Sequence, residues 1–190
     1  MGGEFSEFDS PFPLGADPAL AAWQQSLESI SSSQIAIRTA SPVGSDGRKM
    51  WDLQLVCSPI TVKSVSQNVQ TIVSQSVFLA EVGGVHVGLC ISHPGRAIGE
   101  PLYIQVVAVA PRAQRRGVGS ALLSAAAEAE PKRSIALATQ DANTGARAMV
   151  ESFARSLGAN VERVKLGTFR DSDLAISRGL GYRAWLVRRP

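Results

Sequence analysis

The chain has 190 residues, of which 45% are hydrophobic and 18% are charged, a composition that suits one ordinary folded domain and excludes a wholly disordered chain. No apolar stretch approaches the roughly 20 residues of a membrane-spanning helix, and the first residues carry no basic or apolar leader, so we expect a cytoplasmic protein with no membrane partner. The net charge of +3 conceals an asymmetry, because residues 1–37 hold five acidic and no basic side chains, and the basic remainder favours a polyanionic ligand.

Residues 1–33 are predicted to be an acidic N-terminal tail that contains one short helix over residues 17–30. Asp17 has the side chain of a good N-cap, and Pro18 suits the first helical position because its missing N–H would have no partner there. Apolar residues then recur at helical spacing and predict a face that docks on the sheet, lines the substrate entrance or joins a second subunit: Leu20, Trp23, Leu27 and Ile30.

Residues 34–190 are predicted to form one α/β domain with a mixed sheet, because runs typical of strands alternate with runs typical of helices. The expected strands cover residues 34–39, 76–82, 85–92, 102–109, 134–139, 161–166 and 183–188. The expected helices cover residues 48–75 in two pieces, 117–130, 143–157 and a short helix at 172–179, and a loop is expected at 41–47. In the second piece of 48–75, apolar side chains stand at helical spacing: Val62, Val65, Val69, Ile72 and Val73.

Cys57 and Cys90 both stand among apolar residues, which predicts buried, reduced thiols. Because the chain has only two cysteines and two histidines, we expect neither a disulfide framework nor a four-ligand zinc site, and no metal cofactor. His86 in a strand and His93 in a loop are interpreted as satisfied or exposed histidines.

The segment that follows the strand over residues 102–109 carries the strongest chemical signal. It is a basic, glycine-rich loop that opens an alanine-rich helix, through Arg112, Arg115, Arg116, Gly117 and Gly119. Glycines let backbone N–H groups approach a ligand closely, and the first N–H groups of a helix have no internal partner, so this loop predicts a pyrophosphate cradle. The other interpretation is a plain strand–loop–helix connection with solvated arginines.

Two common nucleotide-binding motifs are excluded by single residues of this loop. A Walker loop requires a lysine after its last glycine, and no lysine follows Gly119. A Rossmann fingerprint requires a third glycine where the chain has Leu122. The cradle therefore fits a different phosphate-bearing ligand.

Residues 114–119, which read Gln-Arg-Arg-Gly-Val-Gly, resemble the Q/R-x-x-G-x-G/A signature of the GNAT superfamily of N-acetyltransferases. The likeness extends outward, because residues 107–111 are similar to that family's fourth strand and residues 78–88 to the hairpin before it. Residues 135–139, followed by Asn143 in an Asn-x-x-Ala pattern, resemble the family's fifth strand and next helix.

The resemblance covers about residues 34–190 and implies an α/β fold with a mixed, mostly antiparallel central sheet of about six to seven strands flanked by helices. It implies an N-acetyltransferase that uses acetyl-CoA and transfers the acetyl group to a primary amine of a small molecule or protein, by direct attack on the thioester. The alternative is a non-catalytic acyl-CoA-binding or regulatory module. A homodimer is expected from the resemblance alone. Nucleic acid is not expected as a partner, because the basic residues are not interleaved with exposed aromatics.

Carried over to this sequence, the family's cofactor-binding positions are Val107, Ala108, Val109, Arg112, Gln114, Arg115, Arg116, Gly117, Val118, Gly119, Ser120 and Asn143. The backbone N–H groups of residues 114–120 would hold the CoA pyrophosphate, and the backbone of Val107 and Val109 would pair with the pantetheine arm like an added strand. The Val109 amide would also polarise the thioester carbonyl. Asn143 would hydrogen-bond the pantetheine or a phosphate, or cap the helix that follows it, and both roles can hold at once.

The tyrosine that serves many members of this family as general acid is missing, because Ala154 or Ser177 stands in its place in the two registers considered. Three residues are candidates for the proton chemistry: Tyr103, Glu81 and Glu100. Tyr103 would be a catalytic or substrate-contacting phenol, or an ordinary strand aromatic. The two glutamates would be proton acceptors or surface carboxylates. Tyr182 is interpreted as a core residue, and water chains with positioning alone remain a further route.

Overall fold

The computed structural model describes residues 17–31 and 34–190, so the predicted tail over residues 1–16 lies outside the described residues. Within this part of the chain the helices are α1 (Pro18–Glu28), α2 (Asp46–Val56), α3 (Val65–Ser74), α4 (Val118–Ala129) and α5 (Thr144–Ser156). The strands are β1 (Ile35–Thr39), β2 (Ser76–Val82), β3 (Val85–Pro94), β4 (Leu102–Val109), β5 (Ile135–Gln140), β6 (Asn160–Val164) and β7 (Tyr182–Arg188). None of these helices combines the length and the apolar character needed to cross a lipid bilayer.

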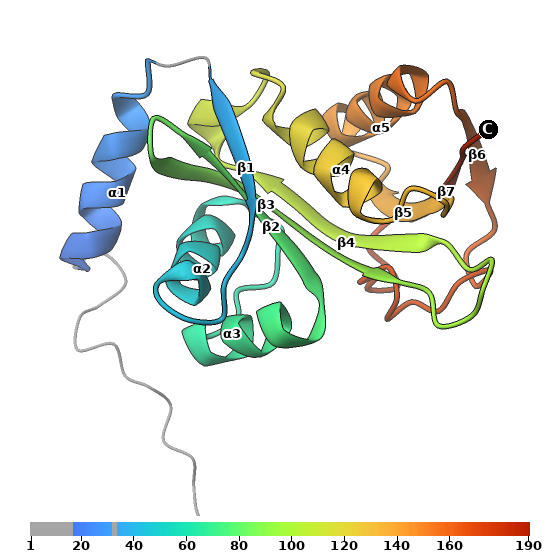
Figure 1. Ribbon diagram of the computed structural model, residues 1–190, viewed down its shortest axis with the longest axis horizontal. Coiled ribbons are helices and arrows are strands. Elements are labelled where there is room, and N and C mark those ends of the chain that lie inside the picture. The colour runs from blue at the N-terminus through green and yellow to red at the C-terminus, as the bar shows by residue number, and fades with distance from the viewer. Residues whose placement is uncertain (1–16, 32–33) are drawn as a thin grey trace, which may run out of the picture.

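The strands of the described residues form one seven-stranded sheet in the order β1-β2-β3-β4-β5-β7-β6. Each neighbouring pair is antiparallel except β4 and β5, which run parallel. The predicted mixed, mostly antiparallel sheet flanked by helices is therefore confirmed. Figure 1 shows α4 and α5 over one face of this sheet and α2 and α3 over the other.

One predicted helix is absent from the described residues, and another helix begins earlier than predicted. Residues 172–179 form turns instead of a short helix, and Ala175 has a positive φ of 51°, which a right-handed helix does not accept. Helix α2 begins at Asp46, inside the loop predicted at residues 41–47. Its start is fixed there because the Asp46 carboxylate accepts the N–H of Ser41 and pairs with Arg38 of β1 at 2.7 Å.

The buried face of α3 is mixed, where the sequence predicted an apolar one: Ile72 is buried in the main core as predicted, but polar side chains are buried beside it. Val65 and Val73 are exposed, whereas Asn68 and Thr71 are buried. The Asn68 amide donates to Gln54 Oε1 of α2 at 3.0 Å and accepts from Gln54 Nε2 at 2.9 Å. Because burying an amide without a partner is costly, this reciprocal pair is what allows two polar side chains to lie between the helices.

The main core lies between the sheet and the helices that cover it. Leu79 of β2, Leu89 of β3 and Leu122 of α4 have no exposed surface. Cys57 and Cys90 are free and buried, as predicted. Burial raises the pKa of the Cys57 thiol to about 11 and that of Cys90 to about 12, so both thiols stay protonated at neutral pH and are poor nucleophiles.

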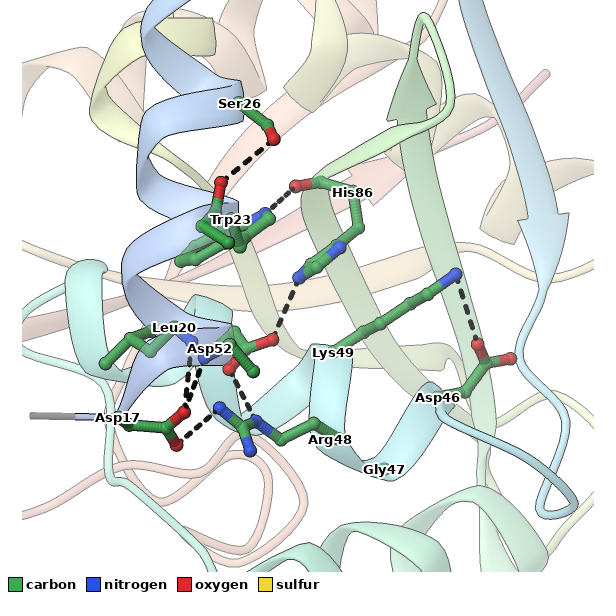
Figure 2. Close-up of polar contacts among 12 residues, drawn as sticks. Asp17, Leu20, Trp23, Ser26, Asp46, Gly47, Arg48, Lys49, Asp52 and His86 are labelled. Atoms are coloured by element: carbon green, nitrogen blue, oxygen red, sulfur yellow. Dashed lines mark hydrogen bonds and ion pairs between the residues drawn. The ribbon is translucent and has the colours of Figure 1, made fainter. Parts of the chain in front are cut away.

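Helix α1 is held against α2 and β3 by a chain of polar and aromatic contacts, drawn in Figure 2. Asp17, its N-cap, pairs with Arg48 of α2 at 2.7 Å, and Arg48 also pairs with Asp52. The second Asp52 oxygen lies 3.2 Å from His86 Nε2 of β3. The His86 ring stacks on Trp23 with 4.7 Å between ring centroids, and Trp23 Nε1 donates to the His86 carbonyl at 3.0 Å.

The predicted cap and the burial of the apolar face are confirmed within the described residues, and of the three places where this face could dock, the structure shows the core of the same chain. Asp17 accepts the backbone N–H groups at the helix start, and Pro18 occupies the first helical position. Leu20, Trp23 and Leu27 are buried and belong to the main core. The division of the chain into residues 1–33 and 34–190 stays a prediction, but the core that it would divide includes side chains from both parts.

Candidate functional site

The sheet opens between its two parallel strands. The last pair between β4 and β5 joins Ile104 to Leu137, although β4 continues to Val109 and β5 to Gln140. On its other side β4 stays paired with β3, with Gln105 as the extra residue of a β-bulge. A bulge bends the strand that contains it. The two strands therefore separate directly after their last pair, at the point where the bulge bends β4.

Beyond the bulge, β4 has one open backbone edge. The N–H of Ala110 donates to the carbonyl of Val87 on β3 at 2.8 Å. Because successive residues of a strand alternate in direction, Ala108 faces β3 as well, whereas Val107 and Val109 direct their N–H and C=O groups toward the side that β5 has left. An extended ligand on that side can pair with these groups as an additional strand, although the Val109 carbonyl already accepts one hydrogen bond from Gln114 and keeps one lone pair for a ligand.

The chain enters α4 through two residues with positive φ, Arg115 at 60° and the N-cap Gly117 at 84°. The first hydrogen bond of the helix runs from the N–H of Ala121 to the Gly117 carbonyl, so the N–H groups of residues 118–120 have no partner inside the helix. Among the described residues no side chain at the N-cap accepts them. They lie at the positive end of the helix dipole, where an anion is stabilised.

A cavity of about 420 Å³ lies over this turn, and we call it the α4 cavity. The residues predicted to hold a cofactor that line it are Val107, Val109, Gln114, Arg115, Gly117, Val118, Gly119, Ser120 and Asn143. The Gln114 amide donates to the Val109 carbonyl at 3.1 Å and so ties the loop to the end of β4. Ala108, Arg112 and Arg116 are not among the residues of its wall.

The three arginines of the basic loop face in different directions. Arg115 lines the α4 cavity. Arg112 instead pairs with Glu28 at the end of α1, with Nη2 2.7 Å from Oε2, and Arg116 donates to the Ile30 carbonyl at 3.4 Å. Two of the three arginines predicted to bind the cofactor are thus held toward the segment that contains α1.

Gly119 lets α4 and α5 approach each other closely. A Cβ atom at this position would lie 2.4 Å from Met149 Sδ of α5, closer than such atoms come in proteins. The sequence assigned this glycine to the close approach of a ligand, and the structure adds a contact between helices as a second reason. Met149 itself lines the α4 cavity, so a change at Gly119 also changes the wall of that cavity.

A second cavity, of about 390 Å³, passes through the opening between β4 and β5, and we call it the through-sheet cavity. On one face of the sheet it is lined by α4 and α5, including Leu123 and Val150. On the other face it is lined by residues 59–61 of the α2–α3 connection and by residues that precede β7, including Leu180. The two cavities adjoin, because their walls share Val107, Asn143, Ala146 and Met149.

Asn143 lies where the two cavities meet. Its Oδ1 accepts the N–H of Ala146 at 2.9 Å, which confirms that it caps α5. This hydrogen bond uses only the side-chain oxygen. The side-chain NH₂ group has no hydrogen-bond partner among the described residues and can donate to a ligand. Its role toward a ligand stays a prediction, and the cap does not compete with that role.

Tyr103 lines neither cavity. Its side chain is buried in a small second core, with ring centroids 5.2 Å from His93 and 5.5 Å from Phe169. Burial raises the pKa of the phenol, and the carboxylates of Glu100 and Asp173 raise it further. The hydroxyl therefore stays protonated at neutral pH, away from the opening between β4 and β5.

The two candidate glutamates also lie outside both cavities. Glu81 Oε1 accepts from Lys49 at 3.0 Å and from Arg38 at 3.0 Å. Burial opposes ionisation of Glu81, but these hydrogen bonds outweigh it and hold the pKa below its usual value. Glu100 Oε2 accepts the N–H of Ala97 in the loop before β4 at 3.2 Å. The structure thus does not bring the three catalytic candidates together with the cradle.

Two titratable side chains of the described residues do line the through-sheet cavity, and neither was assigned to a site from the sequence. Tyr182 is half-buried at the start of β7, beside Gln140 of β5, where the sequence indicated a core residue. Lys63 lies in the connection between α2 and α3. In the sequence, the Gly181-Tyr182 pair was a weak indication that Tyr182 belongs to the site. A single lysine in a loop gives no such indication for Lys63.

A family model described as the acetyltransferase (GNAT) family matches residues 50–158 of the chain. The matched segment begins inside α2 and ends directly after α5, so it includes the hairpin, β4, the glycine-rich turn and β5. A comparison with curated protein sequences finds no match.

Solved acetyltransferase structures share the fold. The diaminobutyrate acetyltransferase of Paenibacillus lautus, solved with L-2,4-diaminobutyric acid and coenzyme A, has a TM-score of 0.65 at 17% identity, over 82% of this chain and 95% of that one. A GNAT family acetyltransferase of Elizabethkingia anophelis with acetyl-CoA bound has a TM-score of 0.57 at 20% identity, over 82% of this chain and 98% of that one. The ribosomal-protein-S18-alanine N-acetyltransferase of Escherichia coli has a TM-score of 0.56 at 18% identity, over 81% of this chain and 92% of that one.

Proposed function

The chain belongs to the GNAT acetyltransferase family, and on this premise we propose that it transfers the acetyl group of acetyl-CoA to a primary amine by direct attack of the amine on the thioester. The acceptor is a small molecule or a protein. We further propose a cytoplasmic homodimer that works without a metal, nucleic-acid or membrane partner.

The residues around the α4 cavity fit coenzyme A. The unpartnered N–H groups of residues 118–120, with Arg115 beside them, suit a pyrophosphate, and the open edge at Val107 and Val109 suits the amide groups of a pantetheine arm. Bound acetyl-CoA would supply an activated acetyl thioester. The observation that carries the proposal is that the cradle, the open edge and the through-sheet cavity adjoin, so one path leads from the phosphate-binding amides through the sheet.

Tyr182 is the proposed proton donor to the departing thiolate. Transfer to an amine requires one proton to leave the ammonium and one to reach the sulfur, and a phenol is the strongest uncharged acid that lines the through-sheet cavity. Tyr103, Glu81 and Glu100 do not line the cavity, so water would accept the proton of the amine. Positioning of the two reactants can contribute about 7–11 kcal/mol to the lowering of the barrier, which leaves a modest share to acid–base chemistry.

The acceptors of the structural neighbours span both classes in the proposal. One neighbour was solved with L-2,4-diaminobutyric acid, a small diamine, and another is named for an alanine of ribosomal protein S18. Because the likeness is one of fold, these acceptors leave both a small-molecule amine and a protein amine as candidates for this chain.

Two measurements test the proposal. Calorimetric titration with coenzyme A is expected to show saturable binding, and its absence would remove the cofactor. Incubation with acetyl-CoA and a broad panel of amines and peptides is expected to release free thiol with at least one acceptor. Saturable binding without turnover on any amine would instead favour the non-catalytic acyl-CoA-binding or regulatory module.

A further inference from the structure

Among the described residues, the wall of the through-sheet cavity carries one positive charge and no negative one. Of the described residues that line it, Lys63 has the only formally charged side chain, and no aspartate, glutamate or histidine is among them. An ammonium group entering this cavity therefore meets no carboxylate that would pair with it. A purely cationic acceptor, such as a polyamine, is disfavoured there.

Lys63 is held in place by two buried amides. Its backbone N–H donates to Gln54 Oε1 at 3.0 Å, and its carbonyl accepts from Asn68 Nδ2 at 3.4 Å. Gln54 and Asn68 are 2% and 0% exposed, and they also hydrogen-bond each other. These bonds fix the connection between α2 and α3 at the wall of the cavity, so the position of the Lys63 backbone does not depend on a free loop.

The Lys63 ammonium is not neutralised by the protein. Its hydrogen bond within the described residues goes to Thr71 Oγ1 at 3.3 Å, and residues 17–31 and 34–190 place no carboxylate within ion-pair distance of it. An ammonium has three donors, and a hydroxyl satisfies one of them without neutralising the charge. A ligand carboxylate can therefore pair with this group without displacing a carboxylate of the protein.

The location of Lys63 separates it from the cofactor side of the site. The α4 cavity, which holds the phosphate-binding amides and Arg115, has no wall residue from the α2–α3 connection. In the through-sheet cavity, Lys63 lies on the face of the sheet that α2 and α3 cover, whereas α4 and α5 cover the other (Figure 1). Its charge thus faces whatever enters from the side opposite the cradle.

We propose that the acceptor amine also bears a carboxylate, and that Lys63 binds this carboxylate and so determines specificity. The proposal rests on the proposed acetyl transfer, because only then is this end of the cavity an acceptor site. It predicts that the protein selects amino acids or other aminocarboxylates over amines of the same length without an anionic group.

The test compares three probes that share a primary amine on a four-carbon chain: 4-aminobutyrate, butylamine and 1,4-diaminobutane. Aminocarboxylates of three, five and six carbons extend the first probe, so that chain length does not decide the result. Binding to the full chain, with and without coenzyme A, is measured by ligand-observed NMR and calorimetry. Wild type is compared with Lys63→Met, Lys63→Arg and the control Lys132→Met, which removes the same charge from an exposed position between α4 and β5.

At least one aminocarboxylate is expected to bind wild type at least 10-fold more tightly than butylamine, and 1,4-diaminobutane to bind weakest. Lys63→Met is expected to remove this preference, Lys63→Arg to keep most of it, and Lys132→Met to leave it unchanged. The proposal is overturned if no aminocarboxylate binds, if butylamine binds equally well, or if the preference survives in Lys63→Met with an unchanged circular dichroism spectrum.

These outcomes are separate from a failure of the proposed function. Coenzyme A affinity is expected to agree within about twofold between wild type and Lys63→Met, because Lys63 does not line the α4 cavity. If wild type does not bind coenzyme A, the proposed acetyl transfer is contradicted. If 4-aminobutyrate and butylamine bind equally well, only the proposal of an aminocarboxylate acceptor is contradicted.

Discussion

The two cavities of this protein are built in different ways. The α4 cavity is lined mostly by one short segment, residues 107–120, with a second contribution from residues 143–152 at the start and middle of α5. The through-sheet cavity is assembled from residues of many elements: α2, the α2–α3 connection, β3, β4, α4, β5, α5, the residues before β7 and the start of β7. A ligand of the first is recognised mainly by backbone N–H groups that the glycines of the turn expose, whereas a ligand of the second meets side chains that are particular to this chain.

The difference teaches where specificity can change. Backbone recognition requires glycines and a strand–turn–helix geometry, so it tolerates little substitution and serves one kind of ligand. Side-chain recognition across a gap in the sheet can change one residue at a time without loss of the fold. Substitutions at three positions test this contrast directly, and a fourth prediction compares how the two sides of the molecule respond to acid; the predictions follow in order of decreasing effect.

Gly119→Asp is expected to abolish binding of coenzyme A, with a loss of at least 100-fold in a calorimetric titration. The Cβ atom would press on Met149 Sδ, and the new carboxylate would stand beside the amides of the cradle and repel a pyrophosphate. Gly119→Ala is the matched variant, because it adds the Cβ atom without the charge, and a smaller loss is expected from the displacement of Met149 alone.

If Gly119→Asp binds coenzyme A as tightly as wild type does, the assignment of the pyrophosphate site to the start of α4 is wrong. If alanine and aspartate cause the same loss, the contact between α4 and α5 is the whole reason for the glycine. Thermal unfolding of both variants separates a loss of binding from a loss of fold.

Tyr182→Phe is expected to lower kcat by about 100-fold and to leave the affinity for coenzyme A unchanged, because general acid catalysis contributes on the order of 10²–10⁴. The substitution keeps the ring in the cavity wall and removes the hydroxyl only. Steady-state kinetics with the best acceptor of the panel, and a pH profile of kcat, measure the effect. Tyr103→Phe is the matched control for loss of a phenol outside both cavities, and an equal loss there would return the role to Tyr103.

Acid is expected to weaken the α2 side of the molecule before the α4 side. The hydrogen bonds from Arg38 hold the pKa of Asp46 at about 2, below its ordinary 3.8, although burial opposes this. A lowered pKa stabilises the fold above pH 4, and the stabilisation is lost as the pH falls toward 2, on the order of 1–2 kcal/mol. Hydrogen exchange between pH 5 and pH 3 should show α2 opening earlier than α4, which is held by apolar contacts.

Asp46→Asn is the variant that checks this cause. It is expected to lower the stability at pH 7 and to flatten the dependence of stability on pH between 4 and 2. If the variant keeps the slope of wild type, another carboxylate, such as Glu81, is responsible for it.

Asn143→Ala has the smallest expected effect and acts on the junction of the two cavities. Loss of the hydrogen bond to the Ala146 N–H is expected to cost about 1 kcal/mol of stability. Asn143→Ser keeps a capping oxygen and removes the NH₂ group, so it is expected to retain stability while weakening coenzyme A binding by a fewfold. Equal affinity of the serine variant and wild type for coenzyme A would show that Asn143 only caps α5 and does not bind the cofactor.

The same contrast explains how much could be predicted from the sequence. The turn at Gly117 and Gly119 was predictable because all the residues that form it are consecutive in the sequence. The strand and helix that flank it also have clear hydrophobic periodicity. Lys63 and Tyr182 were not, because they stand more than 100 residues apart and line the same cavity only through the topology of the sheet. Tyr103 was assigned from its register in the family resemblance and Glu81 from its place on a hairpin, and neither argument says which face of a strand a side chain occupies.

The buried face of α3 shows the same limit on a smaller scale. Val65 and Val73 have the spacing of a core face, but the reciprocal amide pair of Asn68 and Gln54 takes the interior position. Hydrophobic periodicity cannot reveal such a pair, because its stability depends on a partner 14 residues away in another helix.

The contact between α1 and the basic loop has a practical consequence for anyone who prepares this protein. Glu28 pairs with Arg112, and Arg116 donates to the Ile30 carbonyl, so the N-terminal segment touches the turn that opens α4. A purification tag fused ahead of α1, or a shortened clone that starts after it, alters the immediate surroundings of that turn. Affinities for coenzyme A measured on differently cloned versions are therefore not interchangeable, and high ionic strength, which weakens an exposed ion pair, belongs among the conditions to hold constant.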